Sequence, residues 1–230
     1  MNFLKSHLAL YFLFGILYFI AIIMDWLYLT YVMKPLFIGA IFFYYLEESK
    51  TSVTYYNCAI IALLFISGII NLIEGYSYFI YVLLLNFLAY CLLLYQLIKE
   101  LIRKKHPTIQ KVNLLYIILT VVFLICALYI SSFIVFDKSF ELYKVVIVYG
   151  LVVASVVFCA TLLYLSTPTH KNTYLMLYTL DIIICELFYG IYHYYHSLLL
   201  IRLVSVFCYI LSFYFLGNYF VKDNNDQTEQ

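Results

Sequence analysis

The chain has 230 residues, of which 67% are hydrophobic and 11% are charged, and its mean hydropathy is +1.00. This balance excludes an ordinary soluble domain, and the formal net charge of +1 excludes a strongly basic nucleic-acid-binding protein. Runs such as AIIALLFISGII are apolar throughout rather than alternating, which favours membrane helices over a β-barrel. We therefore expect an all-α polytopic membrane protein that has no nucleic acid as a partner.

Apolar segments separated by short polar breaks predict a bundle of about eight transmembrane helices. The breaks are too short to hold a soluble domain, so we expect residues 1–221 to form a single helical membrane domain and residues 222–230 a polar cytoplasmic tail. A first helix is expected to be retained, because Lys5 precedes a long apolar run without a small-residue cleavage site. The expected spans are 8–29, 34–47, 57–74, 77–98, 112–135, 142–165, 173–190 and 196–221, of which the second is short.

The distribution of Lys and Arg predicts the orientation of these spans. With eight spans, the side of the termini receives Lys5, Lys50, Lys99, Arg103, Lys104, Lys105, Lys111, Lys171 and Lys222, and the other side receives Lys34, Lys138, Lys144 and Arg202. Because positive charges gather in cytoplasmic loops, both termini are expected to be cytoplasmic. No organelle address is evident, so we expect a multi-pass protein of the bacterial inner (plasma) membrane.

No motif in the chain indicates a cofactor or a metal. The six cysteines lie in apolar segments without CxxC spacing and are interpreted as small buried hydrophobes. His193 and His196 have the spacing of a metal pair but lie on a short loop without other obvious ligands, which favours a plain interfacial turn. No internal repeat is visible, and Pro35 and Pro168 are expected near span ends, which disfavours a carrier with interrupted helices.

Polar residues within the apolar segments are the candidates for function. Asp181 lies midway through the seventh span, where it cannot reach water easily, so a functional or a buried and paired role is favoured. Asn71 and Glu74 are three residues apart on one helix face in the outer half of the third span. Glu186, five residues after Asp181, points about 140° away from it, so the two acids need not share a pocket.

Two cations and one acid near the outer edge admit two interpretations each. Lys34 and Arg202 can extend to outer headgroups or can bind a substrate phosphate. Asp25 lies beside Trp26 and Tyr28, a pattern that is typical of an interfacial aromatic belt as well as of a site.

Several short motifs give the chain a resemblance to a known family. They are MKPL at the second span, FISGIINLIE at the end of the third, the mid-helix Asp181, and the final span LVSVFCYILSFYFLGNYF. In this order they resemble the YhhN-like, or lysoplasmalogenase, family. The resemblance implies an eight-helix enzyme that cleaves the vinyl ether bond of lysoplasmalogens to a fatty aldehyde and a glycerophospho-base.

The match to the family pattern is partial. Lys34 and Pro35 match its Lys-Pro pair, Asp181 stands at its late Ser-Asp pair with Leu180 in place of Ser, and Tyr209 fits its final-span tyrosine. Positions that differ are Ile70 and Asn71 for Gly-Asp, Tyr90 or Cys91 for a histidine, and Phe213 for a glutamine.

The resemblance places roles on individual residues. Asp181 is expected to be the general acid, Glu74 the charge-stabilising base, and Asn71 a group that orients water. Lys34, Arg202 and Tyr209 are expected to bind the substrate, a lysophospholipid within the membrane lipids. Two alternatives remain open, a non-catalytic lipid-binding or structural protein of the same fold and, less favoured, a small-molecule carrier. The oligomeric state also remains open.

Overall fold

The computed structural model describes residues 4–49, 53–73, 76–103, 111–135 and 142–228, and within these ranges it contains helices and no strand. A short 3-10 helix, η1 (Asn71–Ile73), follows α3, and a π-helical segment, η2 (Ile130–Val135), follows α5. The α-helices are α1 (Leu4–Ile23), α2 (Leu27–Ser49), α3 (Tyr55–Ile70), α4 (Tyr76–Arg103), α5 (Lys111–Tyr129), α6 (Tyr143–Ser166), α7 (His170–Tyr194) and α8 (Leu199–Thr228).

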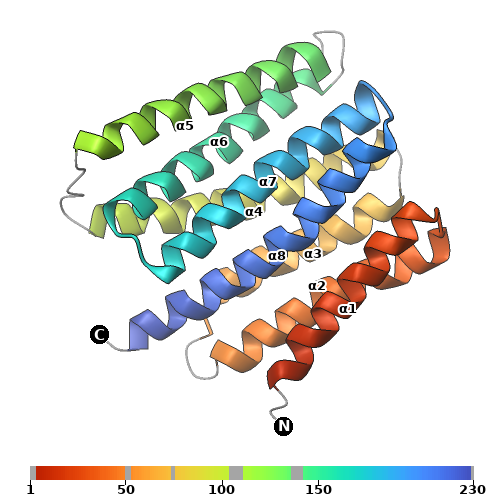
Figure 1. Cartoon of the computed structure of the whole chain (residues 1–230), viewed down its shortest axis with the longest axis horizontal. Helices are drawn as coiled ribbons and strands as arrows, with labels where there is room; N and C mark the ends of the chain where they lie inside the picture. Colours follow the sequence, from red (N-terminus) through yellow and green to blue (C-terminus); the bar gives the residue numbers. More distant parts are fainter. Residues whose placement is uncertain (1–3, 50–52, 74–75, 104–110, 136–141, 229–230) are drawn as a thin grey trace.

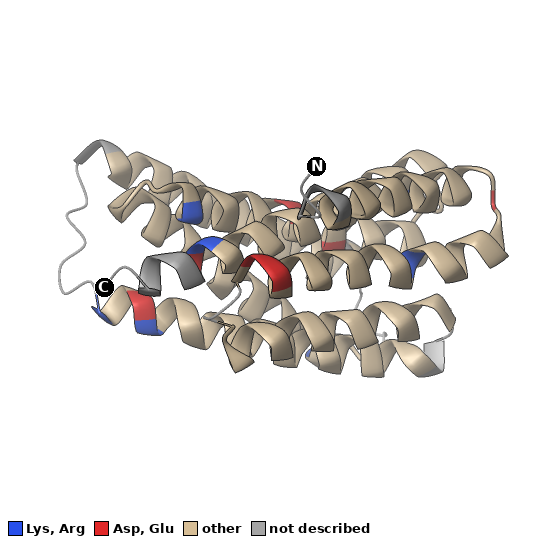
Figure 2. Ribbon diagram, turned by 90° about the horizontal axis from the view of Figure 1, so that it is seen from below, with Lys and Arg blue, Asp and Glu red and all other residues tan. Residues whose placement is uncertain are grey.

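These helices confirm the predicted all-α polytopic membrane bundle. Seven of them are long and apolar enough to cross a membrane, and the apolar stretch of α1, His7–Ile23, is slightly shorter. Figure 1 shows the helices running side by side along one diagonal, with both chain ends at the same end of the bundle. In Figure 2, charged residues interrupt long uncharged helical stretches at only a few places.

The boundary between the first two helices differs from the prediction. The expected break at residues 30–34 is wrong, because the chain turns at Met24, Asp25 and Trp26, where Asp25 has a φ of 55°. Aspartate tolerates this left-handed conformation better than most residues, so it can end a helix where no glycine is present. As a result α2 is 23 residues long rather than short, and Pro35 lies inside it rather than near its end.

Six helices form a closed ring around the interior of the bundle. Successive neighbours in this ring are α2, α3, α4, α6, α7 and α8, and α8 packs back on α2. The closure is tight at Gly217, where a Cβ atom would lie 2.9 Å from Cγ1 of Ile41. Outside the ring, α1 packs on α2 and α8, and α5 packs on α6, as Figure 1 shows at opposite edges of the molecule.

The two halves of the chain share one packing pattern, although the sequence shows no internal repeat. In each half an outer helix, α1 or α5, packs on the helix that follows it, and the next three helices pack in chain order. The contacts α4 with α6 and α8 with α2 then join the halves in equivalent ways. Structural repetition is common among membrane transport proteins, so the ring has the layout from which such folds build a central cavity.

Aromatic side chains fill much of the interior between α1, α2 and α8. Phe37 is fully buried, and the rings of Tyr11, Tyr18, Tyr209 and Phe213 lie 5.5–6.1 Å from its ring. Three of these four contacts are edge-to-face, the arrangement that the aromatic quadrupole favours. The Tyr11 hydroxyl donates to the backbone carbonyl of Ile210, so this ring also satisfies its polar atom.

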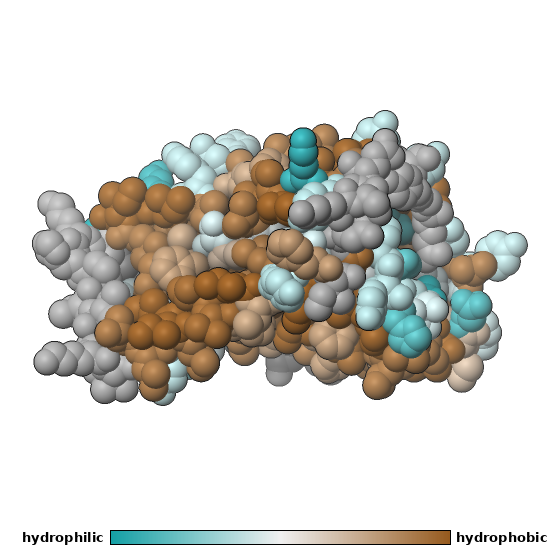
Figure 3. Space-filling model, turned by 90° about the horizontal axis from the view of Figure 1, so that it is seen from above, coloured by the Kyte–Doolittle hydropathy of each residue, from teal (hydrophilic) through white to brown (hydrophobic). Residues whose placement is uncertain are grey.

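The outer surface of the bundle is apolar, as a lipid environment requires. Figure 3 shows large hydrophobic areas on the face seen there. The outer helix α5 carries most of its side chains on the surface, and its large exposed apolar residues include Leu114, Leu115, Ile118, Leu119, Val122 and Ile125.

A buried ionic cluster joins three helices near the end of the bundle that carries the termini. The Lys171 ammonium at the start of α7 donates to both carboxylate oxygens of Glu100 on α4 at 3.0 Å and lies 2.5 Å from Oδ1 of Asp223 on α8. It also lies 5.6 Å from the centre of the Tyr219 ring. With only 6% of Lys171 exposed, the cluster is shielded from water, so its charges depend on one another.

Loss of the central cation should therefore destabilise the bundle. In Lys171→Met the carboxylates of Glu100 and Asp223 are left together without their cation, and we expect a loss of about 3 kcal/mol in stability. Thermal unfolding of the detergent-solubilised protein measures it, with the exposed Lys99→Met as the matched control. Equal melting temperatures for the two variants would contradict the role of this cluster.

Candidate functional site

A cavity lies inside the helical ring at the end opposite the chain termini. Its wall comes from the last turns of α1, α3 and α7, the segment η1, and the first turns of α2, α4 and α8. The empty space in it and at its open mouth amounts to about 1130 Å³. The cavity is therefore a concave site that opens to the outside of the bundle.

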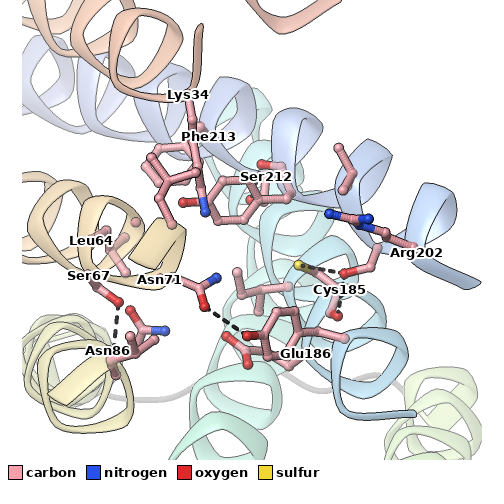
Figure 4. Close-up of a pocket in the computed structure, with 18 of the residues that line it drawn as sticks. Lys34, Leu64, Ser67, Asn71, Asn86, Cys185, Glu186, Arg202, Ser212 and Phe213 are labelled. Atoms are coloured by element: carbon pink, nitrogen blue, oxygen red, sulfur yellow. Dashed lines mark hydrogen bonds between the residues drawn. The ribbon is translucent and has the colours of Figure 1, made fainter. Parts of the chain in front are cut away.

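Two cations reach the cavity from different helices. Lys34 on α2 is 5% exposed, and its ammonium lies 5.2 Å from the centre of the Tyr209 ring. Arg202 on α8 lies 5.5 Å from the Tyr192 ring, measured from Cζ. Figure 4 shows the ends of both side chains directed toward the same space. Aromatic faces attract cations without neutralising them, so these ring contacts leave each side chain its positive charge.

The burial of Lys34 follows from the corrected boundary of α2. Since this helix begins at Leu27 rather than at residue 34, Lys34 lies two turns inside it and faces the ring interior. Extension to outer headgroups, one of the two interpretations of this residue, does not fit that placement. Gly68 on α3 makes room for the neighbouring Tyr209, because a Cβ there would lie 2.8 Å from the Tyr209 hydroxyl.

Polar groups that can orient a ligand or a water molecule lie between the cations and the deeper part of the cavity. The Tyr189 hydroxyl donates to Oδ1 of Asn71 at 2.8 Å, which directs the amide nitrogen of Asn71 elsewhere as a donor. On α8, the Ser205 hydroxyl donates to the backbone carbonyl of Cys185 at 3.0 Å. These contacts hold the wall in one arrangement and join α3 to α7 and α7 to α8.

Glu186 is the one carboxyl residue among the described residues that line this cavity. Its Oε1 atom accepts a hydrogen bond from the Tyr149 hydroxyl at 2.8 Å and a longer one from the Tyr90 hydroxyl at 3.4 Å. The two tyrosines come from α6 and α4, and their ring centres lie 5.8 Å apart. Residues from three helices thus meet at one carboxyl oxygen, and Figure 4 shows the Glu186 side chain among the residues that line the cavity.

The structure brings together four of the six residues predicted for the site. Lys34, Asn71, Arg202 and Tyr209 line the cavity. Asp181 does not line it, and its buried Oδ2 atom has no hydrogen-bond partner among the described residues. Glu74 lies outside the described residues. The catalytic role of Asp181 thus stays a prediction that the geometry of this cavity does not favour.

A stripe on α7 explains why one acid enters the cavity and the other does not. The α7 side chains that line it follow helical spacing through Tyr178, Ile182, Cys185, Glu186, Tyr189, Tyr192 and His193. Asp181 falls just beyond the edge of this stripe, in agreement with the expected 140° between the two acids. The spacing of aromatic and polar residues along α7 was the signal that could have selected Glu186 from the sequence.

Three residues of the carboxyl environment were not singled out as site residues from the sequence. Asn86 and Tyr90 are four residues apart on α4 and both line the cavity. Tyr149 on α6 does not line it and donates its hydrogen bond to Glu186 from the α6 side. With 27 tyrosines in the chain, residue type alone does not distinguish these from tyrosines that fill space.

Among the described residues, no group of three or more His, Cys, Asp or Glu side chains is placed to bind one metal ion. His193 lines the mouth of the cavity, and its ring centre lies 4.3 Å from that of Tyr189. His196 follows the end of α7 and is exposed.

Fold and site together define the class, a polytopic helical membrane protein with a cationic and aromatic cavity that carries one tyrosine-held carboxyl group. Comparisons with protein-family models, with curated proteins and with solved structures find no match to this chain.

The close approach at Gly68 leads to a testable consequence. In Gly68→Ala the new Cβ meets the Tyr209 hydroxyl and Cδ1 of Ile38, at 2.8 and 3.1 Å, so we expect overpacking to cost about 1–3 kcal/mol. Gly39→Ala is the control, because nothing lies within 4 Å of a Cβ there. Thermal unfolding compares the two variants. An unchanged melting temperature for Gly68→Ala would show that the contact is easily relieved.

Proposed function

We propose that this protein binds a single-chain phospholipid in the cavity and hydrolyses the vinyl ether bond of lysoplasmalogen-type substrates. The observation that carries the proposal is the order of groups along the cavity, with two cations at one part of the wall and a single tyrosine-held carboxyl at another. A lysoplasmalogen has the same order, a phosphate-bearing headgroup followed by the vinyl ether. The sequence resemblance to the lysoplasmalogenase family supports the same substrate class.

In this proposal the two cations bind the phosphate of the headgroup. Lys34 and Arg202 can each donate charge-assisted hydrogen bonds to phosphate oxygens, and the planar guanidinium can do so with two N–H groups. The rings of Tyr209 and Tyr192 restrict these two side chains, which lowers the entropy lost on binding.

Hydrolysis of the vinyl ether needs one group that first gives and then accepts a proton. In the proposed reaction the Glu186 carboxylic acid protonates the enol carbon, and the resulting oxocarbenium ion is stabilised by the carboxylate left behind. Water then attacks this ion and returns its proton to Glu186. The hemiacetal breaks its carbon–oxygen bond to the glycerol, which yields a fatty aldehyde and the glycerophospho-base.

The surrounding residues have supporting roles in this reaction. The Tyr149 and Tyr90 hydroxyls donate to one carboxyl oxygen, so the other oxygen can exchange the proton with substrate. Asn71, held by Tyr189, can orient the attacking water through its amide. These residues position reacting groups, and Glu186 alone transfers the proton.

A second candidate function is binding of the same lipid without turnover. The observation that favours it is that the described lining provides one carboxyl residue, and that an amide, Asn71, stands where the family pattern has an aspartate. The two candidates differ in one measurement. A purified protein that binds lysophospholipid but releases no aldehyde from plasmenyl lysolipid supports binding alone.

The role of Glu186 can be tested against that of Asp181. In Glu186→Gln the amide oxygen still accepts from Tyr149, but no proton can be transferred, so we expect aldehyde release to fall on the order of 100-fold or more. Asp181→Asn should retain activity within a few-fold. Both variants should bind a non-cleavable acyl lysophospholipid as the wild type does. The reverse pattern would move the general acid to Asp181.

The two cations should govern affinity for the phosphate. We expect Lys34→Met and Arg202→Met each to raise the Kd for an acyl lysophospholipid about tenfold or more, because each removes a charge-assisted hydrogen bond. Affinity for a monoacylglycerol of the same chain length should stay nearly constant. Lys222→Met, exposed near the other end of α8, is the control. Equal losses for both ligands would indicate damage to the fold rather than loss of phosphate contacts.

A further inference from the structure

A second cavity shares a wall with the first and lies between α4, α5, α6 and α7. The empty space in it and at its open mouth amounts to about 660 Å³, and it is lined mainly by apolar side chains. Phe79, Leu83, Glu186 and Tyr189 line both cavities. The carboxyl group of the proposed site therefore stands on the boundary between a polar and an apolar space.

The two tyrosines bound to Glu186 mark this boundary. Tyr90 lines the first cavity and Tyr149 lines the second, and both hydroxyls donate to the same carboxyl oxygen. The carboxyl is thus approached from both spaces. The two cavities thus adjoin each other at the Glu186 carboxyl.

Small residues and the π-helical segment keep the second cavity open. On α6 it is lined by Gly150 and Ala154, and on α5 by Ala127, where larger side chains would narrow it. It extends along α6 from Val146 to Ala154, which is about 12 Å at the helical rise of 1.5 Å per residue. Ser131 in η2 lines it as well, and π-helical turns are frequent at functional sites.

We propose that this second cavity holds the hydrocarbon chain of the same lipid whose phosphate is bound by Lys34 and Arg202, and that the α5–α6 wall sets the preferred chain length. This inference rests on the proposed function for the identity of the headgroup. The order of the three parts carries it: the phosphate lies at the cations, the bond that joins glycerol to chain lies at Glu186, and the chain lies beside Gly150 and Ala154.

The mainly apolar lining of the second cavity favours a hydrocarbon chain over a polar ligand as its occupant. Apart from the shared Glu186 and Tyr189, the polar residues that line this cavity in the described part of the chain are Tyr149 and Ser131, and Tyr149 is already bonded to Glu186. Burial of methylene groups against such a wall is favourable in proportion to the apolar area that it covers. A longer chain should bind more tightly until the cavity is full.

The test uses affinity for non-cleavable acyl lysophospholipids with eight-carbon and sixteen-carbon chains, measured in detergent on the whole protein. In Ala154→Leu the added atoms enter the deeper part of the cavity, so we expect affinity for the longer chain to fall about tenfold, with the shorter chain nearly unaffected. Gly150→Leu should act in the same direction, although its Cβ also meets Cδ2 of Leu128 at 2.9 Å. Val148→Leu, on the exposed face of α6, is the matched control.

A third variant distinguishes this site from the deeper part of the first cavity. Ile182 lines the first cavity and not the second, so Ile182→Trp should leave the preference between the two chains unchanged. A change of chain preference in Ile182→Trp, or an equal loss for both chains in Ala154→Leu, would overturn the inference. The readout is binding, so absence of aldehyde release would reject the proposed hydrolysis without affecting this result.

Discussion

The burial of a carboxyl group inside an apolar bundle is the constraint on which the rest of this structure depends. Hydrocarbon provides no hydrogen-bond donors, so a carboxyl at this depth requires partners from the protein itself. Glu186 obtains them from Tyr149 and Tyr90 on two other helices. The requirement brings α4, α6 and α7 together at one point, beside the cavity that Glu186 lines.

The closed ring of six helices provides the space around that point. The cavity is lined by helices from both halves of the chain, and Tyr18 and Ile22 of the outer helix α1 complete its wall. The opposite end is closed by Lys171 with its two carboxylates, which joins α4, α7 and α8. A buried ion-pair cluster therefore joins the helices at the end that carries the termini. The other end contains the open cavity, which has a cationic and aromatic lining.

The comparison of Asp181 with Glu186 shows what a residue's depth along a span can and cannot predict. Depth selected Asp181 as an acid that cannot easily reach water, and in the structure its Oδ2 atom is buried while the residue as a whole is half-buried. Depth gives no information on which helix face turns to the ring interior. That face is chosen by the packing of α7 against α6 and α8, and it includes Glu186 and not Asp181.

Composition and hydropathy by themselves determined the class of this protein, its helical architecture and the approximate positions of its spans, because a lipid environment imposes long apolar helices on any chain that crosses it. The positions of polar residues in apolar spans also selected Lys34, Asn71 and Arg202, and the family resemblance selected Tyr209; the fold brings these four to one cavity. Only the tertiary structure decided the turn at Asp25, the equivalent packing of the two halves, and the cavity wall that contains Glu186. The turn at Asp25 rests on a left-handed backbone conformation that an aspartate by itself does not predict. The spacing along α7 marks an aromatic and polar face, but contacts between helices far apart in the chain, such as Tyr149 with Glu186, decide that this face turns to the cavity.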